Sequence, residues 1–447
     1  MEEDMKKIAF LFLLYLSLIV YGYSASWRIT GNPCMRSMAG MITNTFNNQI
    51  VLFGGENGRL PWGQCFNDLW TFDLTNETWK LVESTGPMPS PRYDISVTYH
   101  DLDNRMILFG GSIGTALYND VWEFNLNSGL YGWTQLAPSG TLPSPRSSVA
   151  AVIDPVNNRL VIFGGCTSTG AVNETWSLNL NNLSWSQLSP TGTPPSPRYA
   201  LSGVYDSVGH QMLVFGGINT SLFNETWALD LTPGSEHWEQ LSPGGAIPAA
   251  RCRHFWFFDE SNRDMYIGFG YYNSMTFFND VYVLHLNGMT WNQIQPTGLS
   301  IAPRRGSCAA YSSTTRKAYV FGGDYRDYYF TNYYFDDTYV LSMDSVVSIQ
   351  ETDDINVPFI MFIRPNPARA SCQIRANISD PGKCDLRVVD VMGRIVKTFF
   401  NTHWVAGDNI INWDLTDNNE RRLPAGTYFI LMEKDGNKSV KKSILIE

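Results

Sequence analysis

The sequence predicts an all-β protein in which a six-bladed β-propeller is followed by a small immunoglobulin-like β-sandwich. Three markers repeat in step and predict the propeller: a double glycine, an arginine that follows Pro or Ala, and a tryptophan. The first glycine recurs at intervals of 52 to 56 residues, at Gly54, Gly110, Gly164, Gly216, Gly270 and Gly322, the fifth being followed by Tyr271. A fixed repeat of this length indicates a solenoid or a propeller.

Each repeat contains four strand-like runs. In the third unit they are residues 148–153, 160–163, 175–180 and 185–188, separated by turn residues such as Asp154-Pro155. Four short antiparallel strands make one propeller blade, and the glycines supply the positive φ that a sharp exit from the second strand requires. With their Asn-Asp/Glu-x-Trp segments, the units resemble kelch repeats of galactose-oxidase-like propellers.

The N-terminal residues have the layout of a secretory signal peptide. Lys6 and Lys7 precede an apolar run from Ile8 to Val20, and small residues follow as far as Ser26. The run is shorter than the roughly 20 apolar residues that span a bilayer. We expect a cleaved signal peptide over residues 1–26, with an uncleaved anchor as the alternative, and no transmembrane segment in the mature protein.

The two ends of the repeat array predict how the ring closes. Trp27 and the residues after it resemble the fourth-strand segment that begins at Trp79 in the next unit. The sixth unit has the opposite defect, since no tryptophan follows Leu341. We expect the N-terminal strand to supply the missing outermost strand of blade six, which removes an open sheet edge. The propeller then covers residues 27–344.

Up-and-down strand topology places one arginine and one acidic residue of every blade at the same end of the propeller. The arginines are Arg36, Arg92, Arg146, Arg198, Arg251 and Arg304, and the acids are Asp68, Asp120, Glu174, Glu225, Asp280 and Asp337. A charged binding ring is one interpretation. Because the pattern is present in every blade, we interpret the residues instead as structural pairs of an arginine fork with a carboxylate.

A ligand site is expected where the blades differ, in the loops between second and third strands. The loops of blades five, six and one, which become neighbours on closure, are rich in aromatic residues. Their candidate binding residues are Trp62, Tyr271, Tyr272, Phe277, Asp324, Tyr325, Arg326, Tyr328, Tyr329, Tyr333 and Tyr334. Aromatic rings with a few polar groups suit a glycan or a protein partner. The alternative is that the rings pack on one another.

Composition and motifs argue against several other functions. The formal charge of −10 repels phosphate backbones, so nucleic acid is not an expected partner. The resemblance to galactose oxidase raises a copper-dependent oxidase or a carbohydrate-active enzyme as the alternative function. However, the six histidines are scattered, at His100, His210, His237, His254, His285 and His403, so we expect no metal, no cofactor and no catalysis. His254 is the best single candidate for a ligand.

The seven cysteines leave at least one thiol unpaired in an exported protein. Cys372 and Cys384 flank the turn-like segment 378–382. Two cysteines that face each other across a hairpin can form a disulfide, so we expect a bridge between these two. The sequence gives no connectivity for the other five.

The C-terminal residues form a second domain. A polar, acidic linker over residues 345–357 precedes about seven short strand-like runs in 358–447, which suggests an immunoglobulin-like sandwich. Pro365-Asn366-Pro367, Asp390 to Arg394, Leu423 to Tyr428 and Lys441 to Ile446 resemble the C-terminal sorting domain of the type IX secretion system. The resemblance implies export by that machinery, and a secreted or outer-membrane cell-surface protein of a Gram-negative bacterium. We expect a binding protein.

Overall fold

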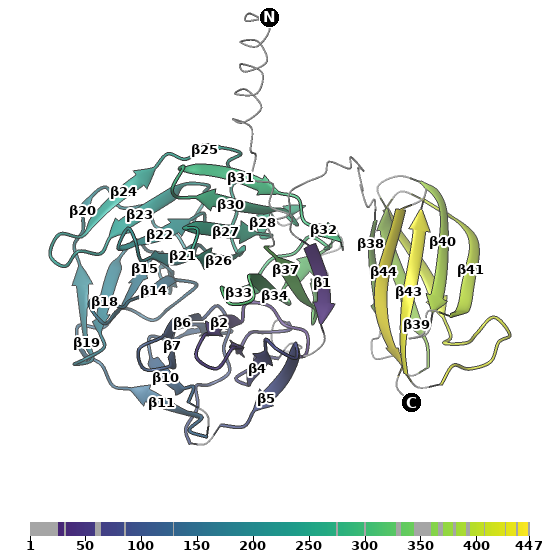
Figure 1. The fold of residues 1–447 in the computed structure, drawn as a ribbon, viewed down its shortest axis with the longest axis horizontal. Coiled ribbons are helices and arrows are strands. Elements are labelled where there is room, and N and C mark those ends of the chain that lie inside the picture. Colours follow the sequence, from purple (N-terminus) through teal and green to yellow (C-terminus); the bar gives the residue numbers. More distant parts are fainter. Residues whose placement is uncertain are drawn as a thin grey trace, which may run out of the picture. The chain divides into compact units, whose positions relative to one another are not determined.

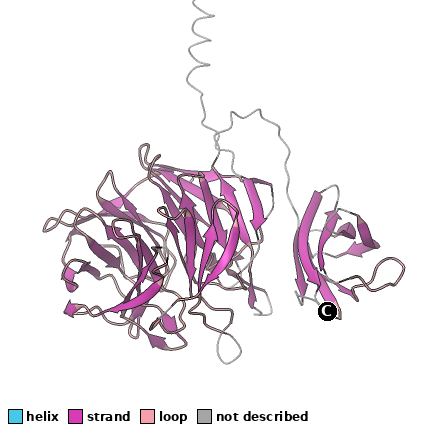
Figure 2. Ribbon diagram, turned by 60° about the horizontal axis from the view of Figure 1, so that its bottom comes forward, coloured by secondary structure: helices cyan, strands magenta, loops and turns pink. Residues whose placement is uncertain are grey.

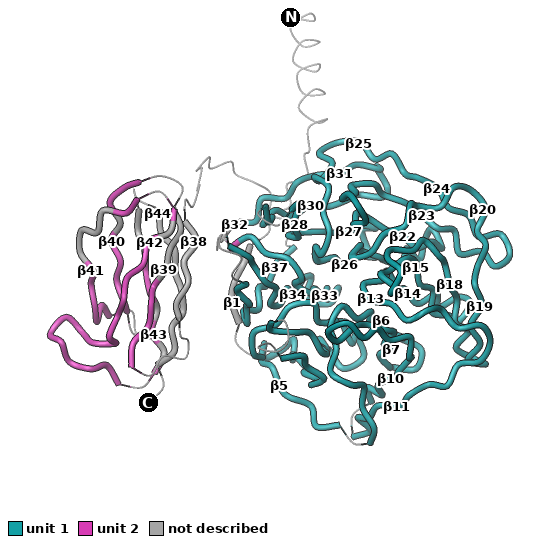
Figure 3. The backbone as a smooth tube through the Cα atoms, turned by 180° about the vertical axis from the view of Figure 1, so that it is seen from behind, with its two compact units in different colours: residues 1–298, 303–348 teal, residues 299–302, 349–447 magenta. Residues whose placement is uncertain are grey.

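The computed structural model describes residues 26–30, 33–58, 64–84, 86–127, 129–273, 276–298, 301–327, 332–343, 359–364, 370–378, 381–389, 394–405, 407–424, 426–434 and 437–445. The predicted linker, and the predicted signal peptide apart from Ser26, lie outside these residues. Within them the chain consists of strands, turns and loops, without a helix (Figure 2). It divides into two compact units, residues 1–298 with 303–348 and residues 299–302 with 349–447 (Figure 3).

Six sheets of four or five strands follow one another in the described part of the first unit, and each sheet is one blade (Figure 1). Blade one contains β2 (Gly40–Asn44), β3 (Gln49–Phe53), β4 (Leu69–Asp73) and β5 (Thr78–Val82). Blade two contains β6 (Ser96–His100), β7 (Arg105–Phe109), β10 (Val121–Asn125) and β11 (Gly132–Leu136). Blade three contains β14 (Ala150–Asp154), β15 (Arg159–Phe163), β18 (Thr175–Asn179) and β19 (Ser184–Leu188), with the short strand β12 (Ser139–Gly140) beside β19.

Blades four to six continue the same order. Blade four contains β21 (Ser202–Asp206), β22 (Gln211–Phe215), β23 (Thr226–Asp230) and β24 (His237–Leu241), with β20 (Thr191–Gly192) beside β24. Blade five contains β26 (Phe255–Asp259), β27 (Asp264–Gly268), β30 (Val281–His285) and β31 (Thr290–Ile294), with β25 (Gly244–Gly245) beside β31. Blade six contains β33 (Cys308–Ser312), β34 (Lys317–Phe321), β37 (Thr338–Ser342) and β1 (Ser26–Thr30), with β32 (Thr297–Gly298) beside β1. The first strands of neighbouring blades contact one another and so surround the axis.

The structure confirms how the propeller closes. Strand β1 pairs antiparallel with β37 over five residue pairs, with Trp27 opposite Leu341, so the N-terminal strand is the fourth strand of blade six (Figure 1). The pairing gives β37 a partner on each side, because β34 covers its other edge. Blade six is therefore built from both ends of the repeat array.

Two rings of backbone hydrogen bonds join each blade to the next. At the start of the first strands, the N–H of each ring residue donates to the carbonyl of its counterpart in the preceding blade, at 2.7–3.0 Å. These six residues are Met38, Asp94, Ser148, Ala200, Arg253 and Gly306, and all have φ between 52° and 65°. The last bond runs from Met38 to Gly306 and closes the ring. We call the end of the propeller that carries these residues the ring face.

The second ring explains the glycine marker. The N–H of the second glycine in each pair donates to the carbonyl of the next blade's repeated arginine, at 2.8–3.1 Å. The approach is close: a Cβ on Gly54 would lie 2.8 Å from the Arg92 carbonyl oxygen. A side chain at that distance requires something to shift, so glycine fits best.

The repeat frame of blade five differs by one residue from the sequence prediction. Phe269 and Gly270, with φ of 62° and 89°, occupy the places of Gly54 and Gly55, whereas the sequence analysis aligned Gly270 with the first glycine. The N–H of Gly270 makes the bond to the next blade's Arg304. Phe269 adopts a left-handed conformation without being glycine, so the double-glycine marker is not visible in the sequence of blade five.

The repeated tryptophan packs blades together. The fourth-strand tryptophan lies 4.6–5.6 Å, between ring centroids, from the phenylalanine that ends the second strand of the preceding blade. The pairs are Phe53 with Trp133, Phe109 with Trp185, Phe163 with Trp238, Phe215 with Trp291 and Phe321 with Trp79. Each pair buries large aromatic surface between two sheets, so the core is distributed over the blade interfaces.

The second unit is a two-layer sandwich of seven strands in the described residues. One sheet contains β38 (Phe359–Arg364), β39 (Cys372–Ile378) and β42 (Gly407–Trp413); the other contains β40 (Gly382–Val389), β41 (Ile395–Trp404), β43 (Gly426–Lys434) and β44 (Asn437–Leu445). Both sheets contribute to one core, in which Ile374 and Trp413 meet Leu386, Val388 and Trp404. The predicted small sandwich is therefore present.

The expected bridge between Cys372 and Cys384 is wrong. Cys372 is a free, buried thiol in β39, and Cys384 belongs to β40 of the other sheet. The two strands do not form the hairpin that the turn-like residues between them suggested. Cys372 instead packs in the apolar core of the sandwich, and burial raises the pKa of its thiol to about 11.

Removing β1 tests the closure. A chain that begins after Thr30 is expected to melt on the order of 10 °C below a chain that begins at Ser26, because five residue pairs are lost, each hydrogen bond contributes about 1 kcal/mol, and each kcal/mol shifts the midpoint by about 2–4 °C. Calorimetry measures the difference. Equal melting temperatures would show that the pairing with β37 does not hold the ring.

Candidate functional site

All six predicted pairs of arginine and carboxylate are formed on the ring face. The shortest nitrogen to oxygen distances are 2.5–2.7 Å, between Arg36 and Asp68, Arg92 and Asp120, Arg146 and Glu174, Arg198 and Glu225, Arg251 and Asp280, and Arg304 and Asp337. Every one of these arginine side chains is at most 1% exposed. They cannot meet a ligand, so they do not form a charged binding ring.

Each buried guanidinium has further partners within its blade. Arg92, for example, also donates to the carbonyls of Gly110 and Ser90 and lies 4.0 Å over the ring of Tyr118. The Trp122 indole N–H donates to the same carboxylate, that of Asp120. The arginines therefore fix the loop between the second and third strands to the strand that enters the blade.

Three of the carboxylates, those of Asp68, Glu174 and Glu225, are held in their charged form. Burial opposes ionisation of Asp68, Glu174 and Glu225, but hydrogen bonds from the arginine and from a tryptophan indole outweigh it. The pKa of each of these carboxyls consequently lies below its usual value. A carboxyl whose pKa is lowered in the folded state stabilises the fold at any pH above its ordinary pKa. This stabilisation is lost as the pH falls through the lowered pKa.

The structure separates the predicted binding residues by exposure. Tyr272 is 51% exposed, and the side chains of Phe277, Asp324 and Tyr333 are buried. Tyr271, Tyr325, Arg326 and Tyr334 are half-buried. Trp62, Tyr328 and Tyr329 lie outside the described residues. Among the described aromatic candidates, Tyr272 is the one that is classed as exposed.

The other aromatic rings pack on one another across two blades. Two loop hairpins carry them: β28 (Tyr271–Asn273) with β29 (Thr276–Phe277), and β35 (Asp324–Arg326) with β36 (Asn332–Tyr334). Ring centroids are 6.0 Å apart for Tyr271 and Phe277, 5.1 Å for Phe277 and Tyr325, and 6.4 Å for Tyr325 and Tyr333. The Arg305 guanidinium lies 4.9 Å over the Tyr271 ring. This stack holds the loops of blades five and six together.

A polar cluster lies beside the stack. The Tyr334 hydroxyl is 3.3 Å from Glu56 Oε1, which joins blade six to blade one. Arg305 Nε donates to Asp324 Oδ2 at 3.0 Å, and Asp324 Oδ1 is buried without a hydrogen-bond partner. Burial, followed by the charge of Asp324, raises the pKa of Glu56. Two carboxylates are thus crowded where three loops meet.

An ion pair spans the ring itself. Arg253 Nη2 donates to Asp94 Oδ2 at 2.8 Å, and both side chains are mostly buried. Asp94 belongs to blade two and Arg253 to blade five, which are opposite one another in a ring of six. The pair therefore crosses the axis of the propeller at the ring face.

Of the four charged residues in these two clusters, Asp324 was predicted from the sequence as a binding residue, whereas Glu56, Asp94 and Arg253 were not. The signal for them was departure from the repeat: the left-handed ring position is uncharged in four blades but is Asp94 in blade two and Arg253 in blade five. Likewise the residue after the double glycine is acidic only in the neighbouring blades one and six, as Glu56 and Asp324. Comparing equivalent positions between repeats would have found both pairs.

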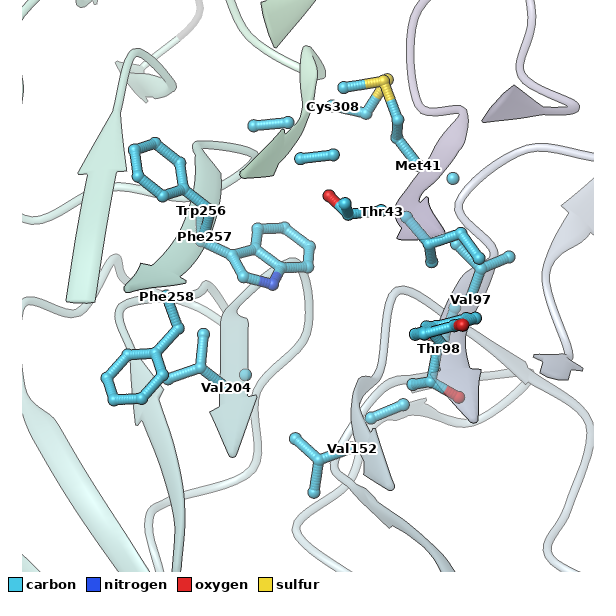
Figure 4. A pocket seen from close by; sticks show the side chains of 18 of the residues that line it. Met41, Thr43, Val97, Thr98, Val152, Val204, Trp256, Phe257, Phe258 and Cys308 are labelled. Atoms are coloured by element: carbon cyan, nitrogen blue, oxygen red, sulfur yellow. The ribbon is translucent and has the colours of Figure 1, made fainter. Parts of the chain in front are cut away.

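Beneath the ring, the first strands enclose a central channel of about 730 Å³. Side chains from different blades converge on it, with Trp256, Phe257 and Phe258 on one side and Val97 and Thr98 on the other (Figure 4). The cavity extends from the ring residues to the turns that connect first and second strands. We call that opposite end of the propeller the turn face.

The histidines lie in separate places. His100, His210, His237 and His285 each contact a different polar side chain, those of Asn158, Asp154, Thr191 and Asp264. His254 is buried, and burial followed by the charge of Arg251 lowers its pKa to about 3. In the described part of the chain, no group of three or more His, Cys, Asp or Glu residues is arranged to hold a metal ion.

Fold and ring face together define a kelch-type propeller followed by a β-sandwich tail. Residues 24–157 and 153–350 match the KLHDC2/KLHL20/DRC7 Kelch-repeats domain, and residues 363–447 match the secretion system C-terminal sorting domain. The chain belongs to the family of Kelch-repeat proteins of this type, and it carries a type IX sorting domain at its C-terminus. These assignments agree with a secreted or cell-surface protein whose propeller has a protein-binding role.

Several curated relatives match part of the chain. The chain is 28% identical over 262 residues to the dynein alpha chain of the flagellar outer arm of Chlamydomonas reinhardtii, covering 55% of this chain and 6% of that one. It is 30% identical over 192 residues to acyl-CoA-binding domain-containing protein 4 of Arabidopsis thaliana (42% and 28%), and over 188 residues to human host cell factor 2 (38% and 23%). It thus spans less than a third of these relatives.

No helix in the described ranges combines the length and the apolar character that a membrane-spanning segment needs.

Removing one arginine tests the structural interpretation of the pairs. Arg92→Ala and Arg92→Lys are both expected to lower the free energy of unfolding by about 3–5 kcal/mol, because the first leaves the Asp120 carboxylate without its partner and lysine lacks the planar fork. Denaturant titration measures this. The exposed control Lys80→Ala is expected to change it by less than about 0.5 kcal/mol. Wild-type stability in Arg92→Lys would contradict the interpretation.

Neutralising Glu56 tests the crowded carboxylates. Because burial and Asp324 raise its pKa, ionised Glu56 costs stability at neutral pH, and the folded state gains stability as the pH falls through the raised pKa. Glu56→Gln is therefore expected to raise the melting temperature at pH 7, with the gain vanishing below the ordinary carboxyl pKa. The exposed control Glu83→Gln is expected to show no such pH-dependent gain. A loss of stability at pH 7 would overturn the assignment.

Proposed function

We propose that the protein is an exported binding protein whose propeller engages a protein partner through the ring face of blades five, six and one. One observation carries the proposal: loops from these three blades, distant in sequence, are joined by the Phe277 to Tyr325 contact and by the Tyr334 to Glu56 hydrogen bond. Loops fixed in advance lose little conformational freedom when a partner binds.

The chemistry of the joined loops suits a protein surface. Tyr272 projects from one hairpin with half of its surface exposed, and Asn273 and Gln64 are exposed on the same three loops. A tyrosine surrounded by hydrogen-bonding groups is the composition typical of interaction hot spots. The stacked rings and the buried carboxylates behind it act as a rigid support.

Export follows from the two ends of the chain. The N-terminal residues have the layout of a secretory leader, and the sorting domain match covers residues 363–447. We infer passage to the periplasm by the leader, and transfer across the outer membrane of a Gram-negative bacterium guided by the tail. Tail removal would then either release the propeller or attach it to the cell surface.

A glycan is the second candidate ligand, because a single exposed ring such as that of Tyr272 also stacks on sugars. No observation favours the enzymatic alternative over these two.

Photocrosslinking tests the proposal. A photoreactive phenylalanine analogue placed at position 272 of the full chain is expected to trap one defined protein in cells that export it. The same analogue at position 81, which is 48% exposed on the outer strand of blade one, is expected to trap none. Tyr272→Ala is expected to weaken binding of the trapped protein about tenfold, equivalent to about 1.4 kcal/mol; Leu81→Ala is the matched control.

Two results would contradict the proposal. Identical adducts at positions 272 and 81 would show that the trapped protein does not bind preferentially to the ring face. A second contradicting result would be that neither position forms an adduct, while the protein binds on a glycan array and Tyr272→Ala abolishes that binding. The ligand would then be a glycan and not a protein.

A further inference from the structure

The turn face carries an apolar collar around the other mouth of the channel. The second residue of the first turn is Phe46, Leu102, Val156 and Val208 in blades one to four, with exposed fractions of 75%, 69%, 71% and 68%. Single exposed apolar residues need no explanation, but here four recur at one position in consecutive blades, each next to a residue that lines the channel mouth.

The rim of this mouth is acidic. In all six blades the first residue of this turn lines the channel, and these residues are Thr45, Asp101, Pro155, Ser207, Glu260 and Ser313. Asp101 and Glu260 are the charged members and lie in the opposite blades two and five. The pKa of Glu260 is raised, first by burial and then by the negative charges of Asp101, Asp206 and Asp259. Asp206 is neutralised by Arg263 at 2.6 Å.

Neither rim carboxylate is neutralised within the protein. Among the described residues, no ion pair involves Asp101 or Glu260. The charged pair at the channel's other end, Asp94 with Arg253, cancels internally. The channel therefore has a net negative charge concentrated at the turn face.

The channel wall just inside the rim is aromatic and apolar. Equivalent positions of the first strands form two layers: Met41, Val97, Ala151, Gly203, Trp256 and Ala309, and, nearer the rim, Thr43, Tyr99, Ile153, Tyr205, Phe258 and Tyr311. In the deeper layer five side chains are small or aliphatic, and Trp256 alone is a large ring. It is 37% exposed, although it lies inside the propeller, so its face borders open space (Figure 4).

We propose that the turn-face mouth of the channel binds a small organic cation with an apolar body, its ammonium group between Asp101 and Glu260 and its body against Trp256. The volume of about 730 Å³ lies within the range of small-molecule sites. The rim attracts an ammonium ion, the Trp256 ring face attracts cations and buries apolar groups, and the collar extends the apolar surface outward. The same rim repels anions, as does the overall charge of −10.

Two probes with the same phenylethyl body and opposite charge test the proposal. Calorimetric titration of the full chain at pH 7 is expected to show 2-phenylethylamine binding at one site, and 3-phenylpropionate binding at least about tenfold more weakly. The double variant Asp101→Asn with Glu260→Gln is expected to weaken amine binding about tenfold. Trp256→Ala is expected to weaken it about three- to tenfold, and Trp256→Phe less.

The controls separate this site from the rest of the protein. Glu239→Gln, on the exposed outer strand of blade four, is expected to leave amine binding unchanged. Tyr272→Ala, on the ring face, is expected to leave it unchanged as well. The proposal is overturned if the amine does not bind, if phenylpropionate binds as tightly, or if the rim double variant retains wild-type affinity.

Discussion

The two closed rings of backbone hydrogen bonds are the constraint on which the structure depends. Each blade donates to its neighbour twice, once from a left-handed residue at the start of the first strand and once from the second glycine of the pair. The donors and acceptors are main-chain groups, and the positive φ of the donor residues favours glycine at the second ring. The pairing of β1 with β37 closes the propeller, because β1 is hydrogen-bonded into blade six and precedes blade one in the chain.

Within that frame, the residues of the two proposed sites are departures from the repeat. Positions that are shared by every blade, such as the arginines, are buried and structural. Positions that change in one or two blades collect on the two faces: Asp94 with Arg253 and Glu56 with Asp324 on the ring face, and Asp101 with Glu260 on the turn face. The ion pair of Asp94 with Arg253 and the crowding of Glu56 by Asp324 each involve two different blades, so they are properties of the ring and of no single blade.

The period of the sequence was sufficient to predict six blades, the closing strand, the arginine pairs and the neighbouring of blades five, six and one. It could not predict which aromatic side chains of the loops are buried. Phe277 and Tyr333 are buried and each packs against Tyr325 from another part of the loops, whereas Tyr272 is exposed although it is next to Tyr271. It also misplaced the frame at Phe269, where a left-handed phenylalanine replaces glycine, and the Cys372 partner, since strand order in a sandwich does not follow turn signals. The crossing pair of Asp94 and Arg253 can be found only by comparing equivalent positions between repeats, because the two residues face one another across the closed ring.

Hydrogen exchange at six backbone amides tests the central claim most directly. In the closed ring, the amide protons of Met38, Asp94, Ser148, Ala200, Arg253 and Gly306 are all bonded to the preceding blade, so all six should exchange slowly and at comparable rates, governed by opening of the propeller as a whole. Fast exchange at any one of them, at the rate of an ordinary surface loop, would show that the ring is open at that blade boundary and would contradict the account.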